Sequence, residues 1–141
     1  MNHQRILEHF QTKVIGLGVN GITKDDVNLP NEKWERRDRK LWFEISVGES
    51  DPINYADEVD RRLISVNVVC AVPIGSGTQR LHNIAERVSR IYTPLYGERA
   101  GFRIGNNVFV VRRVSKYPAE QMTDGLKLNV RFVMELYTKE C

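Results

Sequence analysis

The sequence predicts an α+β fold, a mainly antiparallel mixed β-sheet of four to five strands with two α-helices packed against it. Two segments place apolar residues at the 3.6-residue period of a helix, and several others alternate apolar and polar residues as a strand does. Their order is helix, strand, strand, helix and then two or three strands. Helices segregated in this way pack on one face of an antiparallel sheet.

The first helix is expected over roughly His3 to Leu17. Its apolar residues form a single stripe at the helical period, namely Ile6, Leu7, Phe10, Val14 and Leu17. The glycines at positions 16, 18 and 21 then provide the backbone freedom that ends it. Residues 19–40, with Pro30 and a cluster of mixed charges, form the least ordered-looking segment.

Two strands are expected next. Residues 41–47 alternate with the period of two that places one face on a core. Residues 48–60 are rich in Asp, Glu and Ser and are expected to form a loop. In residues 62–72, both faces of the expected strand carry mostly apolar side chains. This segment is therefore expected to be a central strand covered on both faces.

The second helix follows the break at residues 73–77. We expect the Thr78 hydroxyl to cap it, and it ends before Pro94. One side of this helix is apolar and the other side carries Arg80, Asn83, Arg87 and Arg90.

Strands close the chain. Residues 102–104 and 108–114 are expected to form a hairpin around Gly105-Asn106. A loop over residues 116–124 precedes the last strand, residues 126–137, which alternates apolar and polar side chains with Val133 as the one exception. The whole of residues 1–141 is expected to form one domain, because this length is close to the usual size of a single domain.

Composition limits the function classes. The 21 basic and 18 acidic residues give a net charge of +3, which is mildly basic. The longest apolar runs fall far short of the ~20 residues that a membrane-spanning helix needs. Cys70 and Cys141 are too few for a disulfide framework, so we expect a buried thiol and a free terminal thiol in a reducing compartment. No signal peptide is visible, and a cytoplasmic site of synthesis and assembly is expected.

The residues that usually carry catalysis or bind cofactors are not combined in a recognisable way. His3, His9 and His82 are expected to be isolated surface histidines, because no ligand set for zinc surrounds them. The turn at residues 75–78 lacks the lysine of a phosphate-binding loop. Acidic pairs at residues 25–26 and 57–58 lie in expected loops. We therefore expect neither an enzyme nor a bound cofactor or metal.

The basic residues leave an alternative open. Basic residues on one side of the second helix and on the penultimate strand, together with three others, could form a positive surface. Its residues would be Arg80, Arg87, Arg90, Arg99, Arg103, Arg112, Arg113 and Lys116. Contact with phosphates is one use for such a surface, and contact with an acidic protein neighbour is another. A small basic nucleic-acid-binding module is thus the second reading of this sequence.

The chain resembles the tail terminator, or tail completion, proteins of long-tailed bacteriophages and prophages. The similarity rests on the strand LWFEISV (residues 41–47), the segment VNVVCAVPIGSG (residues 66–77) before the second helix, and the closing strand LNVRFVMELY (residues 128–137). It covers about Leu41 to Tyr137 well and the first helix loosely. Residues 19–40 have no counterpart in it.

The resemblance implies a tail-terminator-like α+β fold and a structural role. Such proteins assemble as a ring, usually a hexamer, on the end of the major tail tube protein, stop its polymerisation and offer a docking surface to the head–tail connector protein. The expected location is the virion tail, reached from the host cytoplasm. Nucleic acid would pass through the ring, and no membrane is involved. The residues expected to contact a neighbouring subunit or the tube are Trp42, Arg61, Arg87, Arg90, Arg112 and Arg113.

Overall fold

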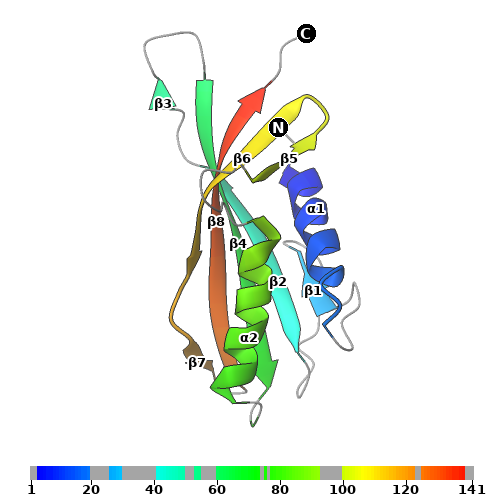
Figure 1. The fold of residues 1–141 in the computed structure, drawn as a ribbon, viewed down its shortest axis with the longest axis vertical. Helices are drawn as coiled ribbons and strands as arrows, with labels where there is room; N and C mark the ends of the chain where they lie inside the picture. Colours follow the sequence, from blue (N-terminus) through cyan, green and yellow to red (C-terminus); the bar gives the residue numbers. More distant parts are fainter. Residues whose placement is uncertain are drawn as a thin grey trace.

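A computed structural model describes residues 3–19, 26–29, 41–49, 53–54, 60–73, 75, 77–92, 100–122 and 125–138. Figure 1 shows its helices and strands. In chain order they are α1 (His3–Ile15), β1 (Val27–Asn28), β2 (Trp42–Glu49), β3 (Ile53–Asn54), β4 (Asp60–Pro73), α2 (Thr78–Ser89), the 3-10 turn η2 (Arg90–Tyr92), β5 (Gly101–Ile104), β6 (Asn107–Lys116), β7 (Glu120–Met122) and β8 (Gly125–Thr138).

The strands form one mixed sheet. The main path across it is β1-β2-β4-β8-β6-β5, with β3 paired to β4 and β7 paired to β8. The β1–β2 pair is parallel, and the other described pairs are antiparallel. The α+β class is therefore confirmed. The prediction of four to five strands is too low, because it missed β1, β3 and β7. These strands fall in segments expected to be loops and are too short to show a period of two.

The inner face of the sheet forms the core with the two helices. On β4, the side chains at alternate positions from Ile64 to Cys70 are fully buried. On β8, those at alternate positions from Val130 to Met134 are fully buried as well. β4 lies between β2 and β8, as expected for a central strand. Because each strand alternates, the intervening side chains of β2, β4 and β8 lie on the opposite, outer face.

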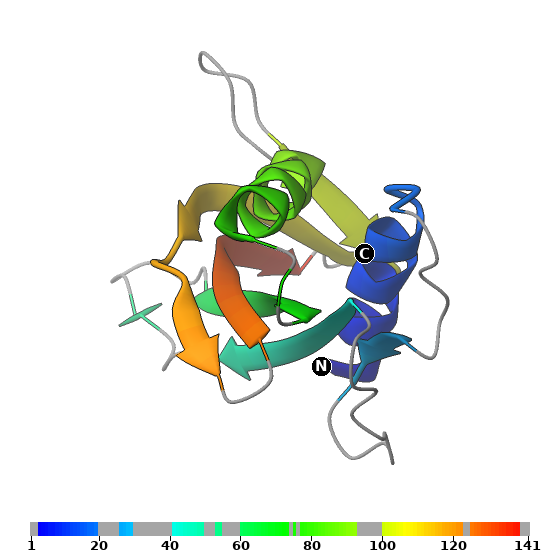
Figure 2. The same cartoon turned by 90° about the horizontal axis from the view of Figure 1, so that it is seen from below.

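Both helices cover the inner face. α2 packs mainly on β4 and β8, and α1 packs on β1 and β2. The sheet curls, and in Figure 2 α1 lies beside both β1 and β5, the two ends of the sheet. Gln11 Nε2 donates to the Val27 carbonyl oxygen of β1 at 3.0 Å, and the His9 ring stacks on Phe102 of β5 with ring centroids 4.2 Å apart. α1 thereby joins the two ends of the curled sheet. No helix in the described part of the chain is long and apolar enough to cross a membrane.

Two details of the helices differ from expectation. α1 ends at Ile15 instead of Leu17, because the Leu17 and Gly18 amides bond to carbonyls three residues earlier, those of Val14 and Ile15, and residues 16–17 form a turn. Thr78 does not cap α2. It is the first helical residue, and Gly77, with φ of 81°, occupies the capping position without a side-chain hydrogen bond. Glycine suits this position because side chains disfavour positive φ.

The segment expected to be least ordered, residues 19–40, contributes to the core. Asp26, Val27, Asn28 and Leu29 are all buried, and Val27 pairs with Phe43 of β2. The apolar pair at positions 27 and 29 is too short to stand out among polar neighbours in the sequence. Residues 20–25 and 30–40 lie outside the described residues.

Candidate functional site

The expected contact residues lie on two different faces. Arg87 and Arg90 belong to the solvent side of the helices. Trp42, Arg112 and Arg113 belong to the outer face of the sheet. Arg61 lies on β4 opposite Ile53, and its side chain is outside the described residues. The structure thus does not bring these residues together into one site.

A β-bulge explains the two adjacent arginines on β6. The register of β6 against β8 shifts between Val111 and Arg113. Strict alternation would direct one of Arg112 and Arg113 into the core, whereas the extra residue of a bulge lets both remain outside. Both side chains are exposed, while Val111 is buried.

Arg112 is fixed by partners on β8. One guanidinium nitrogen donates to Glu135 at 2.9 Å and to the Tyr137 hydroxyl at 3.0 Å. The Tyr137 hydroxyl donates in turn to Glu135. These hydrogen bonds, first of all the one to Glu135, raise the pKa of Arg112 above its usual value. The Arg112 side chain is therefore held in place on the outer face, with its charge paired to that of Glu135.

A polar cluster that the sequence analysis missed crosses the middle of the outer face. Asn67 Oδ1 accepts hydrogen bonds from Asn129 Nδ2 at 3.1 Å and from Arg131 Nε at 3.0 Å. The Arg131 guanidinium lies over the Tyr117 ring, 5.1 Å from its centroid. Asn67 and Arg131 occupy paired positions on β4 and β8, and this register is not evident from the sequence.

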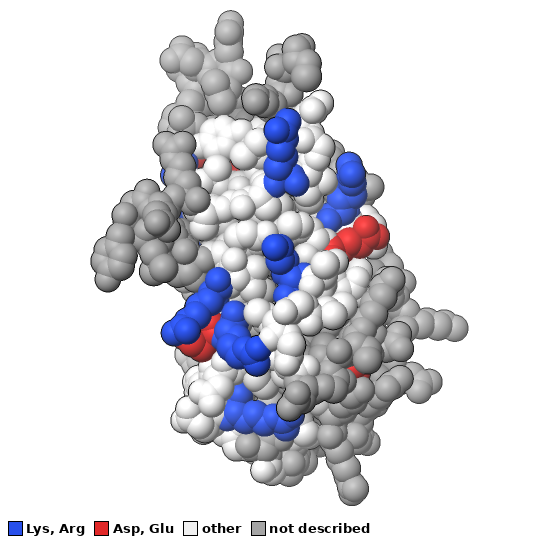
Figure 3. Space-filling model, turned by 45° about the vertical axis from the view of Figure 1, so that its right-hand side comes forward, with Lys and Arg blue, Asp and Glu red and all other residues white. Residues whose placement is uncertain are grey.

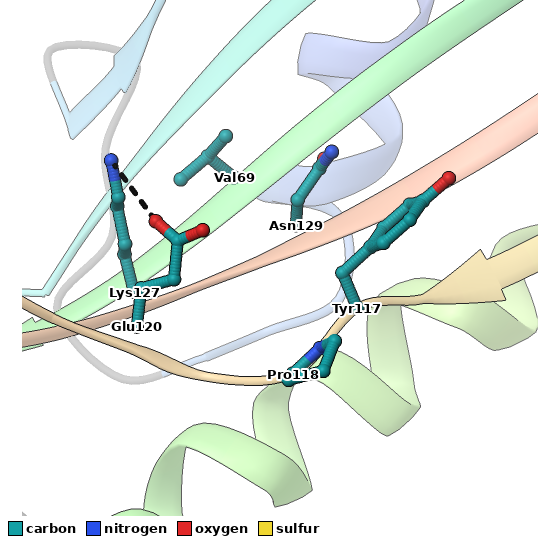
Figure 4. Close-up of a pocket in the computed structure, with 6 residues that line it drawn as sticks. All are labelled: Val69, Tyr117, Pro118, Glu120, Lys127 and Asn129. Carbon is teal, nitrogen blue, oxygen red and sulfur yellow. Dashed lines mark ion pairs between the residues drawn. The ribbon is translucent and has the colours of Figure 1, made fainter.

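A small pocket of about 230 Å³ adjoins this cluster. In Figure 4 the Lys127 and Glu120 side chains pair at one end and the Tyr117 ring stands at the other, with Val69 and Asn129 between them. Lys127 Nζ lies 3.7 Å from Glu120 Oε2. The pocket is lined by groups of both charges and by the Asn129 amide, which suits a polar protein contact.

The helical face is more basic than the sheet face. α1, α2 and η2 carry Arg5, Lys13, Arg80, Arg87 and Arg90 against Glu8 and Glu86. We call the solvent-exposed side of these elements the helix layer. Figure 3 shows blue side chains along the length of this side of the molecule with little red between them.

Glu86 is the acidic residue of α2, and cations surround it. Its carboxylate bonds to Lys116 of β6 and pairs with Arg90 at 3.2 Å. The Lys116 hydrogen bond and charge, together with Arg90, lower the pKa of Glu86. The negative charge of Glu86 is therefore largely offset within the helix layer.

Basic side chains also lie along the seam between α1 and α2. Arg87 donates to the Leu17 carbonyl oxygen, and Lys13 Nζ is 5.9 Å from the centroid of the Tyr92 ring. A hollow of about 500 Å³ opens between the end of α1 and α2. It is lined by Gly18, Val19, Gln79, Arg80, Asn83, Ile84 and Arg87.

His9 is not the isolated surface histidine that was expected. It is half-buried, and its Nε2 shares a hydrogen bond of 2.6 Å with the Tyr92 hydroxyl. Burial, assisted by the charge of Lys13, lowers the pKa of His9. Its ring joins an aromatic cluster with Phe10, Tyr92 and Phe102.

The described residues contain no group of three or more potential metal ligands. The Cys70 thiol is fully buried in the core, as expected, and burial raises its pKa to about 12. Such a thiol is unreactive, because the thiolate is the nucleophilic form. Cys141 lies outside the described residues.

Comparison with known proteins supports the fold. No protein-family model matches the chain, and no curated protein sequence does. A solved structure whose name states no function superposes with a TM-score of 0.63 at 15% identity, over 100% of this chain and 99% of the other. At this identity the likeness shows a shared fold over the whole length.

Proposed function

We propose that this protein is a structural component of a bacteriophage or prophage tail that caps the end of the tail tube as a ring. In this role it stops addition of tube subunits and offers a docking surface to the head–tail connector. The proposal starts from the sequence resemblance to tail terminators over Leu41 to Tyr137. The α+β fold with both helices on one side of the sheet agrees with what that resemblance implies.

A ring is best supported by two separate patches on the outer face. Trp42 forms one patch, and Arg112 and Arg113 form the other. Trp42 lies on β2 and Arg113 on β6, with β4 and β8 between them. Three strand spacings of about 4.8 Å separate these strands, and the sheet that carries them is curled (Figure 2). A closed ring needs head-to-tail contacts in which each subunit uses two unlike surfaces.

The chemistry of the two patches is complementary. Trp42 is a half-buried aromatic side chain of β2, and the bulge on β6 leaves the Arg113 guanidinium exposed beside Arg112, which is paired with Glu135. Cations bind well to the face of an indole ring. In the proposed ring, the Trp42 patch of one subunit contacts the β6 arginines of the next subunit.

Tail-tube assembly in the presence of the purified protein tests this function. The protein should shorten the tubes formed, measured as a length distribution by electron microscopy. Trp42→Ser and Arg113→Glu should each raise the concentration needed by about tenfold or more, as loss of an interface anchor does. Arg80→Glu, the same charge reversal on α2, should leave capping unchanged. Tubes of unaltered length with the wild-type protein would contradict the proposal.

A further inference from the structure

We propose that the helix layer binds the phosphate backbone of duplex DNA. This inference goes beyond tube capping and does not depend on it. The helix layer is distinct from the outer-face patches assigned to the ring, since Arg80, Arg87 and Arg90 lie on α2 and η2 while Trp42 and Arg113 lie on the far side of the sheet.

Basic charge is distributed unequally between the two faces of the molecule. The helix layer carries five basic against two acidic side chains, and Glu86 is held by Lys116 and Arg90. On the outer face, five basic side chains stand against three acidic ones. The basic ones are Arg103, Arg112, Arg113, Lys127 and Arg131, and the acidic ones are Glu44, Glu120 and Glu135. The basic excess of the described surface is therefore greatest over the helices, where Figure 3 shows it.

The cations of the helix layer are spaced in an elongated row. Arg87 and Arg90 lie 7 and 10 residues after Arg80 on α2 and η2. These separations correspond to about 10 Å and about 15 Å along a helix axis. Lys13 lies near Tyr92 at the end of this row. Arg5 continues the basic surface on α1, where its Nη1 lies close to the β5–β6 turn at Gly105. An elongated row of cations suits a polyanion whose charges repeat along a line.

The surface of the helix layer is polar. Tyr117 is the one exposed large hydrophobic side chain in the described part of the chain, and it lies on the loop after β6. Interfaces between proteins are centred on buried aromatic or apolar anchors, whereas protein–DNA interfaces are polar and positively charged. The hollow beside α2 adds the Gln79 and Asn83 amides to Arg80 and Arg87. Side-chain amides and arginines are both common donors to phosphate oxygens. These features favour duplex DNA over an acidic protein.

Fluorescence anisotropy with a short labelled DNA duplex tests this inference. The wild-type protein should bind, and its affinity should fall steeply between about 50 and about 200 mM salt. The double variant Arg80→Gln/Arg90→Gln should bind on the order of tenfold more weakly at the lower salt and show a salt slope shallower by about two. Arg80 and Arg90 are both exposed, and circular dichroism checks that the double variant folds.

The matched control is Arg112→Gln/Arg113→Gln, which makes the same change in net charge on the outer face. It should retain nearly the wild-type affinity for DNA. Equal weakening by both double variants, or no salt-dependent binding by the wild type, would overturn the inference. Tighter binding to poly-glutamate than to the duplex would also overturn it, in favour of an acidic protein partner. Failure here leaves the capping experiment untouched, because capping is expected to depend on the outer-face residues and DNA binding on the helix layer.

Discussion

His9 Nε2 and the Tyr92 hydroxyl oxygen lie 2.6 Å apart, although 83 positions separate the two residues in the chain. This hydrogen bond ties the middle of α1 to the end of η2. Together with the stacking of His9 on Phe102, it joins both helical elements to the edge strand β5. The relative placement of the two helices, and hence of the basic side chains they carry, depends on this junction.

The lowered pKa of His9 predicts that the junction is sensitive to acid. The folded state holds His9 neutral, whereas in the unfolded chain its pKa is near 6.5. As the pH falls below about 6.5, the unfolded state binds the proton more readily, so the free energy of unfolding decreases until the pH drops below the folded-state pKa. Denaturant unfolding from neutral pH to about pH 5 should show this loss.

The control is His9→Gln, which lacks the titrating group. Its unfolding free energy should vary less over the same pH range than that of the wild type. A constant difference between the two proteins across that range would contradict the lowered pKa.

Gly125 is required by close packing between β8 and β4. A Cβ at this position would overlap the Val72 carbonyl oxygen and lie 3.1 Å from its carbon. We expect Gly125→Ala to lower the unfolding free energy by about 1–3 kcal/mol, the usual cost of forcing atoms into a packed interior. Gly48→Ala on β2 is the control, because a Cβ there meets nothing within 4 Å. Equal unfolding midpoints for the two variants would show that the strands do not approach so closely.

The Cys70 thiol should be inert in the folded protein. Its pKa of about 12 leaves almost no thiolate at neutral pH, and its side chain is fully buried. In a Cys141→Ser background, a thiol-specific reagent should give no reaction until guanidinium chloride unfolds the chain. Rapid labelling under native conditions would place Cys70 at the surface and contradict the central position of β4.

Asn67 should stabilise the outer face of the sheet. Asn67→Ala removes the acceptor for Asn129 and Arg131 and should lower the unfolding free energy by about 1–2 kcal/mol. Asn67→Asp keeps an acceptor of the same size and adds an attraction to Arg131, so it should recover most of that loss. If Asn67→Asp destabilised the protein as much as Asn67→Ala, Asn67 would not stabilise the sheet by accepting hydrogen bonds from Asn129 and Arg131.

The long elements were predictable because their side chains repeat with a clear period. The alternation of β8 and the apolar stripe of α2 required no tertiary information, and both packed as expected. Short strands lack a period. β1 and β7, with two and three residues, are defined by pairing with β2 and β8, which residue patterns alone do not reveal.

The surface was less predictable than the core. Sequence position indicated that Arg87 and Arg113 are exposed, and both are. It did not indicate that they lie on opposite faces, because that follows from how α2 crosses the sheet. The Asn67–Arg131 contact and the His9–Tyr92 contact join residues 64 and 83 positions apart. Both depend on strand register and helix packing.

We propose that this protein acts by covering the end of a tail tube. The decisive experiment is electron microscopy of tail tubes that lack a terminator, incubated with the purified, gold-labelled protein. A cap of this kind should place label at one end of each tube and give a ring visible in end-on views. Label spread along the tube walls, or tubes that remain bare, would contradict it.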